Sequence, residues 1–476
     1  MDKARKRYND NRIKHWDKIS FEKDRWFGFG KYYSYRLSQI YKLLVPPGSR
    51  VLEIGCARGD LLASLNPALG VGVDFSKDSI RHAKLKHPEL SFFELDAHEI
   101  DIDEKFDFII LSDLLNDLWD VQLFFMKLEK IVTPNTRIIM NNYSRLWEPF
   151  LAVSKLLRLA KPTLYQNWLA VEDISNLLKL ENFEIINHWS EILFPIKIPV
   201  LTSFFNKIIV KIWPFRIFAL TNFILARPMP KKSLNEKDLS ISVIIPARNE
   251  EGNIKKIMNR VPNMGKGTEI LFVEGHSNDN TFEIIKKAID DNPGRQCKLL
   301  KQTGYGKGDA VRIGFKHAKG DILMILDADM TVPPEDLPRF LDVLIKGKGD
   351  FINGVRLVYP MENRAMRFWN LVGNKFFSLV FSYLIGQPVK DTLCGTKVLK
   401  KIDYDRIAKN RIYFGNFDPF GDFDLLFGAA KLNLKIVDLP VRYRDRTYGT
   451  TNIQRWKHGW ILLRMVLLAA RRLKFK

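Results

Sequence analysis

The sequence predicts two α/β domains, each built around a parallel sheet. Strand-like apolar runs alternate with helical patterns of apolar residues twice along the chain, which is the signature of βαβ units. At 476 residues the chain is also too long for one hydrophobic core. A third observation is the segment RPMPKKSLNEKD between the halves, whose prolines and charges are typical of an exposed linker. We therefore expect a first domain at 1–228, a linker at 229–239, a second domain at 240–450 and a C-terminal helix at 451–476.

The strands are expected where β-branched and other apolar residues cluster between turn residues. In the first half they lie at 50–55, 70–74, 90–96, 106–113, 136–142 and 219–227. In the second half they lie at 241–247, 269–275, 297–302, 321–329, 350–355 and 434–441. Helical spacing followed by a strand pattern at 167–186 predicts the closing helix and strand of the first domain.

Composition and charge limit the partners and the location. The chain has 75 Lys and Arg against 54 Asp and Glu, a net charge of +21, which favours nucleic acid, an acidic membrane surface or phosphorylated substrates as partners. Three widely spaced cysteines without CxxC spacing indicate free thiols rather than a zinc site or redox pair. The basic N-terminus leads into no apolar core of signal-peptide length. These observations predict a cytoplasmic protein.

Three apolar segments are interrupted by basic residues: 192–227, 368–389 and the C-terminal WILLRMVLLAARRLKFK. None reaches the roughly 18 to 20 uninterrupted apolar residues that span a bilayer. The segment 192–227 has two possible interpretations: it packs within the domain, or it forms a flap that faces the membrane or covers the substrate. At the C-terminus, apolar residues at helical spacing beside a basic face predict a helix that lies on anionic lipid, so we expect a peripheral protein on the inner face of the cell membrane.

The segment VLEIGCARGDLLASL places a glycine-bearing loop between a strand and a helix. Gly55 and Gly59 allow a tight turn and close approach of the backbone to a ligand. The next strand ends in Asp74, where a carboxylate can accept hydrogen bonds from both ribose hydroxyls, and another strand ends in Asp96. These features predict a bound nucleoside. A tight turn without a ligand is the alternative, and a dinucleotide is disfavoured because GCARG lacks the G-x-G-x-x-G spacing.

These residues resemble the class I S-adenosylmethionine-dependent methyltransferases, whose domain has a Rossmann-like sheet. The resemblance covers about residues 30 to 230 and implies that S-adenosyl-L-methionine is bound. The cofactor-binding residues that it implies are Glu53, Gly55, Cys56, Gly59, Asp74, Asp96 and Ala97. For the methyl acceptor, the polar residues Asp113, Asn116, Asp117 and His98 are candidates, with helix capping or a surface position as the alternative.

In the second half, four strand-end motifs follow in order: PARNE, EGHSND, GKGDA and DADM. Asp327 and Asp329 of DADM bring two carboxylates close to one point, and oxygen ligands that leave room for phosphate suit Mg²⁺ or Mn²⁺ rather than zinc. Lys307 and the glycines around it precede a helix, where a cation and backbone amides can bind phosphate. Taken alone, the two aspartates could also be solvated caps.

The ordered set resembles the family 2 glycosyltransferases of the GT-A fold, closest to the dolichyl-phosphate mannose synthase group. The resemblance covers 240 to about 455 and implies an inverting transfer from a nucleotide sugar, such as a GDP- or UDP-sugar, with a metal held by Asp327 and Asp329. The donor-binding residues that follow are Pro246, Arg248, Glu250, Glu274, Lys307, Asp327 and Asp329.

Farther along, DTLCGTKVL offers Asp391 and Lys397 near the acceptor, and FGDFDLL offers Asp422 and Asp424. The resemblance places a catalytic base in this acidic pair, and we favour Asp422. A hydroxyl acceptor needs such a base, whereas a lipid phosphate does not, because it is already anionic at neutral pH. Arg446 is expected to bind a phosphate of the donor or acceptor.

The leading hypothesis is a bifunctional enzyme, a methyltransferase joined to an inverting glycosyltransferase, acting on a surface glycan or its polyprenyl-phosphate-linked precursor. One alternative is a polyprenyl-phosphate glycosyltransferase with a degenerate, structural methyltransferase-like domain. A basic nucleic-acid-binding protein is disfavoured, because the chain has no recognisable reading motif and does have DADM.

Overall fold

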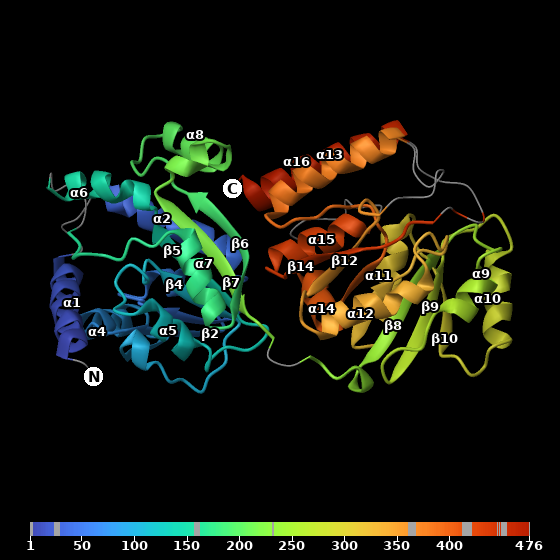
Figure 1. Ribbon diagram of the computed structural model, residues 1–476, viewed down its shortest axis with the longest axis horizontal. Coiled ribbons are helices and arrows are strands. Elements are labelled where there is room, and N and C mark those ends of the chain that lie inside the picture. Colours follow the sequence, from blue (N-terminus) through green and yellow to red (C-terminus); the bar gives the residue numbers. More distant parts are fainter. Residues whose placement is uncertain are drawn as a thin grey trace. The chain divides into compact units, whose positions relative to one another are not determined.

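The computed structural model describes residues 3–22, 29–156, 162–230, 233–359, 368–411, 421–444, 446, 448 and 455–475. This part of the chain forms two compact units that divide between residues 229 and 230, each with its own seven-stranded sheet (Figure 1). The predicted fold class, two α/β domains, is therefore confirmed. The predicted junction between the second domain and the C-terminal helix, at residues 450 and 451, lies outside the described residues.

The first unit begins with two helices before its first strand. Its strands are β1 (Arg50–Ile54), β2 (Leu69–Asp74), β3 (Ser91–Glu94), β4 (Phe108–Ser112), β5 (Arg137–Tyr143), β6 (Phe183–Glu191) and β7 (Thr221–Pro228). Its α-helices are α1 (Lys3–Glu22), α2 (Phe29–Leu44), α3 (Asp60–Ser64), α4 (Lys77–Lys86), α5 (Val121–Leu128), α6 (Glu148–Leu156), α7 (Val171–Leu180) and α8 (Leu201–Lys207).

The sheet order is β3-β2-β1-β4-β5-β7-β6, and β7 runs antiparallel to both of its neighbours. One apolar core joins the sheet to α2, α3 and α4, and another joins it to α5 and α7. The loops that follow β1, β2, β4 and β5 therefore meet at one edge, the carboxyl edge of the parallel strands.

The second unit has the same kind of layered core. Its strands are β8 (Ser240–Ala247), β9 (Gly267–Glu274), β10 (Cys297–Lys301), β11 (Ile322–Ile325), β12 (Phe351–Val355), β13 (Lys397–Lys400) and β14 (Ile436–Pro440). Its α-helices are α9 (Ile254–Arg260), α10 (Thr281–Asp290), α11 (Lys307–His317), α12 (Leu337–Ile345), α13 (Phe368–Ile385), α14 (Lys401–Lys409), α15 (Asp422–Lys431) and α16 (Arg455–Ala469).

The strand order is β10-β9-β8-β11-β13-β12-β14, with β13 antiparallel to β11 and β12. The sequence did not predict β13, because KVLK has a lysine at each end and no apolar period. Lys397 is nevertheless fully buried, since the fold supplies it with polar partners. The predicted strand 321–329 is also corrected: β11 ends at Ile325, and Asp327 and Asp329 lie in the turn that follows.

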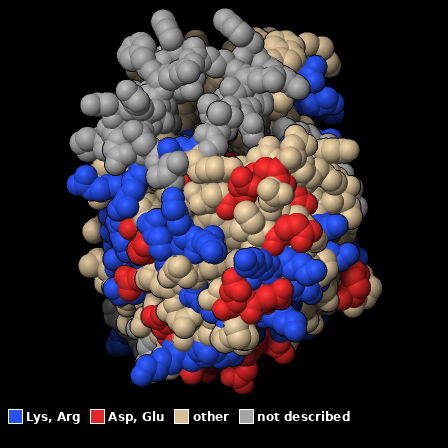
Figure 2. Space-filling view, turned by 90° about the vertical axis from the view of Figure 1, so that its right-hand side faces the viewer, with Lys and Arg blue, Asp and Glu red and all other residues tan. Residues whose placement is uncertain are grey.

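Charge is spread over the face of the second unit seen in Figure 2. Basic and acidic side chains alternate there, and no continuous basic stripe is visible on that face (Figure 2). Among the helices of the described residues, none is both long enough and apolar enough to cross a membrane.

Candidate functional sites

The loop after β1 is shaped by its glycines. Gly55 and Gly59 have φ values of 77° and 73°, which L side chains rarely adopt. A Cβ atom at Gly59 would lie 2.5 Å from the ring of Phe92, so a side chain has no room there. The backbone amide of Gly55 donates to the carbonyl oxygen of Val73 at 2.8 Å and ties the loop to β2. The glycines thus keep a narrow backbone loop at the carboxyl edge.

Asp74, at the end of β2, holds this loop through backbone amides. Its Oδ2 accepts from the amide of Ala57 at 2.8 Å, and its Oδ1 accepts from the amide of Ser76 at 2.9 Å. Ala57 has φ 47°, so the carboxylate stabilises a conformation that a non-glycine residue resists. Each carboxylate oxygen has a second lone pair. Asp74 can therefore support the loop and accept from a ribose hydroxyl.

Two other predicted cofactor-binding residues, Glu53 and Cys56, are buried beneath the loop. Oε2 of Glu53 accepts from the amide of Leu62 at 3.0 Å, in α3. Burial, reinforced by the nearby Asp74 and Glu53, raises the pKa of the Cys56 thiol well above its usual value. The structure gives both residues a supporting position, because neither side chain is open to a ligand.

Asp96 and Ala97 follow β3, where the resemblance places the adenine. Oδ1 of Asp96 accepts from the backbone amide of His98 at 2.9 Å. Burial alone would raise the pKa of Asp96, but its hydrogen bonds with His98 outweigh burial and lower that pKa. Its Oδ2 accepts from Asn9 of α1. The sequence did not predict that α1 contacts Asp96 at the carboxyl edge of the first sheet. Nothing in the sequence of a basic N-terminal helix indicates where that helix packs.

The methyl-acceptor candidates separate in the structure. Asp113 follows β4 with φ 55°, an uncommon backbone conformation for aspartate. Its carboxylate accepts from Tyr33 at 2.9 and 3.1 Å and from Asn141 at 2.6 Å. The rings of Tyr33 and Tyr143 lie 5.7 Å apart beside it. Among the described residues this is a strained, partly exposed carboxylate beside two aromatic rings.

The other candidates for the methyl-acceptor site have different surroundings. His98 is buried and bonded to Asp96 and to the backbone of Asp120, so it does not face a substrate. Asp117 lies 3.5 Å from Arg12 of α1. The amide nitrogen of Asn116 is buried without a hydrogen-bond partner in the described part of the chain. Asp113 is therefore the candidate with the most suitable geometry.

In the second unit, residues that follow β8 and β9 form the first part of the site. Pro246 is half-buried in β8, Arg248 is exposed just beyond the strand, and Glu250 is buried. Oε1 of Glu274 accepts from the amide of Ser277 at 2.6 Å and shapes the loop after β9. Burial, together with Asp329 and Asp327, raises the pKa of Glu250 to about 7. Glu250 therefore lies within the electrostatic reach of both acids of DADM.

The first acid of DADM is neutralised by a lysine. Lys307, the first residue of α11, places its Nζ 2.5 Å from Oδ1 of Asp327. Burial disfavours the charged lysine, but Asp327, Asp422 and Asp329 outweigh it and raise the pKa of Lys307. A Cβ at Gly395 would collide with both charged groups, so the segment before β13 packs directly on this pair. Gly395 is a residue of the site that the sequence did not reveal.

The second acid, Asp329, is held by a hydroxyl and an arginine. Its Oδ1 accepts from the backbone amide and the hydroxyl of Thr331 at 3.1 and 2.9 Å. Its Oδ2 accepts from Arg446 at 2.7 Å, and Arg446 also lies 3.8 Å from Glu250. The two carboxylates of DADM are therefore paired with Lys307 and Arg446 rather than left as solvated caps.

These residues fit a divalent ion that has few protein ligands. Asp327 and Asp329 supply the carboxylate oxygens that Mg²⁺ and Mn²⁺ prefer. In the described residues, however, no three His, Cys, Asp or Glu side chains gather as a metal-binding group. An ion here would therefore need further oxygens from water or a diphosphate, as Mg²⁺ at phosphate sites commonly does.

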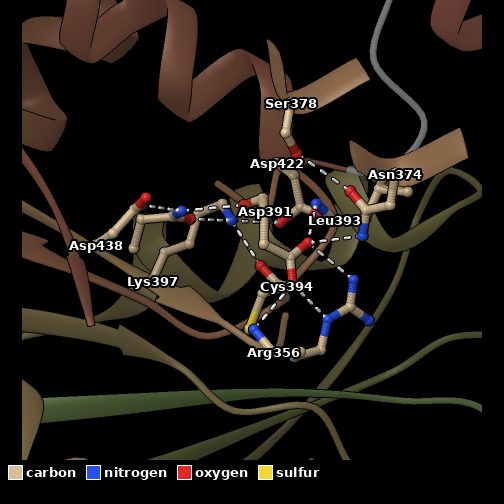
Figure 3. Close-up of polar contacts among 10 residues, drawn as sticks. Arg356, Asn374, Ser378, Asp391, Leu393, Cys394, Lys397, Asp422 and Asp438 are labelled. Carbon is tan, nitrogen blue, oxygen red and sulfur yellow. Dashed lines mark hydrogen bonds and ion pairs between the residues drawn. The ribbon is translucent and has the colours of Figure 1, made fainter. Parts of the chain in front are cut away.

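Asp391, predicted to contact the acceptor, is fully buried in a polar network (Figure 3). It accepts from Arg356 Nε and Nη2 at 2.7 and 2.9 Å and from Asn374 at 3.1 Å. Burial opposes ionisation, but Arg356 holds the pKa of this aspartate below its usual value. The prediction is corrected to a positioning role, because no oxygen of Asp391 is exposed to an acceptor.

Lys397 and Asp422 meet in the same view (Figure 3). Nζ of the buried Lys397 donates to Asn353 at 3.0 Å and to the carbonyl oxygen of Cys394 at 2.6 Å, and it lies 3.3 Å from Oδ1 of Asp422. Asp424 instead pairs with Arg411 at 2.8 Å. The structure thus gives the two acids of the predicted pair different partners, Lys397 for Asp422 and Arg411 for Asp424.

Arginines also line a hollow of about 370 Å³ beyond Asp329. Its basic residues are Arg260, Arg339, Arg442 and Arg444, beside the acids Glu335 and Asp336. Arg260 pairs with Glu335, and Arg339 pairs with Asp336. The backbone of Arg444 is bonded to Thr331, which in turn contacts Asp329. The hollow therefore adjoins the DADM turn.

Comparison with known families gives two matches. Residues 46–191 match a family described as a methyltransferase domain, and residues 242–401 match glycosyl transferase family 2. Both matches confirm the resemblances inferred from the motifs. Curated relatives include undecaprenyl-phosphate 4-deoxy-4-formamido-L-arabinose transferases from Edwardsiella ictaluri, 35% identical, and Salmonella paratyphi B, 28% identical. Each alignment covers 44% of this chain and 61% of the relative, so the chain spans about three fifths of their length.

Two solved structures each align with about half of this chain, at low similarity. Glucosyl-3-phosphoglycerate synthase from Mycobacterium tuberculosis is 18% identical, with a TM-score of 0.36, over 50% of this chain and 82% of that one. The N-methyltransferase NodS from Bradyrhizobium japonicum WM9, solved with S-adenosyl-l-homocysteine, is 15% identical, with a TM-score of 0.30. That alignment covers 42% of this chain and 88% of NodS.

Proposed function

We propose that this enzyme, which joins a methyltransferase domain to a family 2 glycosyltransferase domain, catalyses both reactions in the synthesis of a surface glycan or its lipid-linked precursor. The first uses S-adenosyl-L-methionine, and the second uses a GDP- or UDP-sugar. The observation that carries the proposal is the group formed by Glu250, Lys307, Asp327, Asp329 and Arg446 at one edge of the second sheet.

In the methyltransferase domain, the loop at Gly55 to Gly59 and Asp74 bind the nucleoside and methionine parts of the methyl donor. Asp113 binds a hydroxyl of the acceptor and accepts its proton as the oxygen attacks the methyl carbon. The carbon–sulfur bond breaks, and S-adenosylhomocysteine leaves. Replacing Asp113 with asparagine is expected to lower kcat without weakening S-adenosylhomocysteine binding, because the base does not touch the nucleoside.

In the glycosyltransferase domain, Asp327 and Asp329 would hold Mg²⁺ or Mn²⁺, and the ion would neutralise the diphosphate that leaves. Lys307 and Arg446 supply further positive charge to the diphosphate. Pro246, Arg248 and Glu274 border the place of the nucleoside. Inversion follows when the acceptor oxygen attacks the anomeric carbon from the face opposite the diphosphate.

We favour a polyprenyl phosphate as the sugar acceptor. A phosphate is already anionic and needs no base. Asp422, the residue expected to act as a base, is instead engaged by the buried Lys397, whose Nζ lies 3.3 Å from its Oδ1. Arg442 and Arg444 line the hollow beside Asp329, where guanidinium groups can bind phosphate oxygens. The relatives named as undecaprenyl-phosphate transferases agree with this choice.

A hydroxyl on a glycan is the second candidate acceptor. One observation favours it: Oδ1 of Asp422 has no hydrogen-bond partner in the described part of the chain, apart from its ion pair with Lys397. A base at this position would remove the hydroxyl proton.

A polyprenyl-phosphate acceptor lies in a membrane. It would suit a peripheral location of the enzyme at the inner face of the cell membrane, with α16 on anionic lipid.

Binding and transfer assays test the proposal. GDP, UDP, dTDP and CDP, each with Mn²⁺, and S-adenosylhomocysteine alone are titrated against the full chain in a thermal-shift assay. We expect one nucleotide and S-adenosylhomocysteine to stabilise the protein. If neither did, the bifunctional assignment would fail.

Labelled sugar transfer then separates the two acceptors. With a polyprenyl phosphate, Asp422→Asn is expected to retain transfer within about tenfold, like the surface control Asp405→Asn. For a hydroxyl acceptor, loss of the base is expected to cost on the order of 100- to 10,000-fold. A loss of that size on Asp422→Asn would overturn the phosphate acceptor.

A further inference from the structure

The first unit exposes a large apolar surface that its own fold leaves uncovered. Large apolar side chains are exposed along α6 and along the stretch from Ile198 to Phe218, which contains α8 and η5 (Phe215–Phe218). Val200, Trp213 and Phe150 are 85%, 71% and 64% exposed. A contiguous apolar surface of this kind marks an interaction site in a water-soluble fold. We call the exposed residues of 146–156 and 198–218 the apolar patch.

The two parts of the apolar patch are joined by direct contacts. The indole nitrogen of Trp147 donates to the carbonyl oxygen of Phe218 at 2.9 Å, and the backbone amide of Ser144 donates to Leu220 at 2.8 Å. Figure 1 shows α6 and α8 on the same side of the first unit, beside α2. The patch is therefore one surface rather than two unrelated segments.

Buried polar contacts fix the patch in this orientation. Glu191 pairs with Arg36 of α2 at 3.4 Å and with the buried Lys211. The side chain of Asn206 accepts from the amide of Phe194 at 2.8 Å and donates to Tyr32 at 3.0 Å. Glu191, Lys211 and Asn206 thus point inward, while many large apolar side chains of the same segment, among them Val200 and Trp213, point to solvent. The buried polar contacts hold these apolar side chains at the surface.

The charge of the segment identifies the partner. Residues 192–220 contain no Asp or Glu, and they contain Lys197, Lys207, Lys211 and Arg216. Lys211 is buried in an ion pair with Glu191, whereas the other three basic side chains are exposed. Exposed Trp and Phe side chains flanked by Lys and Arg match a lipid interface with an anionic surface. We propose that the methyltransferase domain docks on an anionic bilayer through the apolar patch.

This surface goes beyond the membrane role expected for α16, because it belongs to the other unit and borders the methyltransferase site. Tyr143 at the end of β5 pairs with Thr221 at the start of β7, so α6 and η5 both adjoin the carboxyl edge that carries Asp113. Tyr32 and Tyr33 are neighbours on α2, and they contact Asn206 beneath the patch and Asp113 respectively. Docking would therefore bring the methyl-acceptor site to the lipid surface.

Vesicle co-sedimentation of the full chain tests the proposal. Vesicles of phosphatidylcholine alone are compared with vesicles that also contain phosphatidylglycerol. The patch variant carries Trp213→Asp and Phe218→Asp, and the control carries Leu85→Asp, which introduces the same charge at an exposed apolar residue of α4 outside the patch. We expect the patch variant to need on the order of tenfold more anionic lipid for half-maximal binding, and the control to behave as wild type.

The contribution of α16 is removed in a parallel pair of proteins. A second parent protein carries Trp460→Asp and Leu467→Asp, both on the exposed face of α16. The patch substitutions are added to this parent, and vesicle binding is compared with and without them. The effect of the patch variant should persist in this background. S-adenosylhomocysteine affinity is expected to stay unchanged throughout, which separates a docking defect from misfolding and from failure of the proposed methyl transfer.

Three results would overturn the proposal. Unchanged vesicle binding by the patch variant in both backgrounds would exclude a lipid occupant. Equal binding to neutral and anionic vesicles, insensitive to salt, would exclude the role of the basic residues. A shift from dimer to monomer by the patch variant, with vesicle binding unchanged, would assign the patch to a second copy of the chain.

Discussion

The two units place aspartates at the same kind of sheet edge but stabilise them differently. At the first edge, Asp74 is held by the backbone amides of Ala57 and Ser76. At the second, Asp327 is paired with the side chain of Lys307, and Asp329 is paired with Arg446 and also accepts from the backbone amide and hydroxyl of Thr331. Backbone donors are fixed by the fold, whereas long cationic side chains can move when another cation arrives. We therefore expect the first site to be preformed for the nucleoside of the proposed methyl donor, and the cationic side chains of the second to exchange partners when the proposed metal and diphosphate bind.

The largest expected effect comes from removing a charge at the second edge. Asp329→Asn should lower sugar transfer on the order of 100- to 1000-fold, because a carboxylate ligand of the proposed metal ion that would neutralise the leaving diphosphate is lost. Methyl transfer should not change. The two rates are measured on the same preparation, with Asp342→Asn, a surface aspartate paired with Lys346, as the control. Survival of both activities would mean that DADM is only a structural turn.

The matching change at the first edge is Asp74→Ala. Loss of a charged hydrogen-bond acceptor should weaken S-adenosylhomocysteine binding by about 10- to 100-fold, and sugar transfer should persist. Calorimetric titration measures the affinity, and Asp78→Ala in the first turn of α4 is the control. If methyl transfer were unaffected, the first domain would not use this edge for the methyl donor.

The pH dependence of stability should differ between the wild-type protein and the Glu250→Gln variant, whose side chain cannot ionise. The pKa of Glu250 is about 7 in the folded protein and 4.5 ordinarily, so the folded state binds the proton more tightly. Its stabilising contribution is complete below about pH 4.5 and is lost as the pH rises through 7. Glu250→Gln should therefore match wild type at about pH 4 and unfold at a higher temperature at pH 8.

Differential scanning calorimetry of the ligand-free protein measures this difference. An increase of about 2–4 °C is expected for each kcal/mol that the buried charge costs. Glu283→Gln, an exposed change on α10, should show no pH-dependent difference. A constant offset at both pH values would assign the effect of Glu250→Gln to packing rather than to ionisation.

The smallest effect is expected at Ala57. Its φ of 47° costs about 1–2 kcal/mol for an L residue, while glycine loses more chain entropy on folding, by roughly 0.5–1 kcal/mol. Ala57→Gly should therefore stabilise the first unit by about 1.5 kcal/mol at most. Thermal unfolding checks the sign, and Ala63→Gly within α3 should destabilise it. A loss of stability on Ala57→Gly would show that the methyl group contributes packing.

The sequence by itself determined that there are two α/β sheets and the order of the motifs at their edges, but it predicted parallel sheets, whereas β7 and β13 run antiparallel to their neighbours. Strand and helix periods are local properties of the chain, and so are the glycine loop at Gly55 and the spacing of Asp327 and Asp329. The extent of β11 and the existence of β13 were missed, because KVLK carries no apolar period and its buried lysine is stabilised by residues from other strands.

Only the tertiary structure decided which groups meet. Arg446 reaches Asp329 across 117 positions of sequence, Asp391 is buried against Arg356, and Asp422 is separated from Asp424 by their different ion pairs. The exposure of the apolar patch is also a tertiary property, since the same residues would be core if another element covered them. Periodicity reports the local backbone, whereas charge partners and solvent exposure depend on contacts between segments that the chain brings together only on folding.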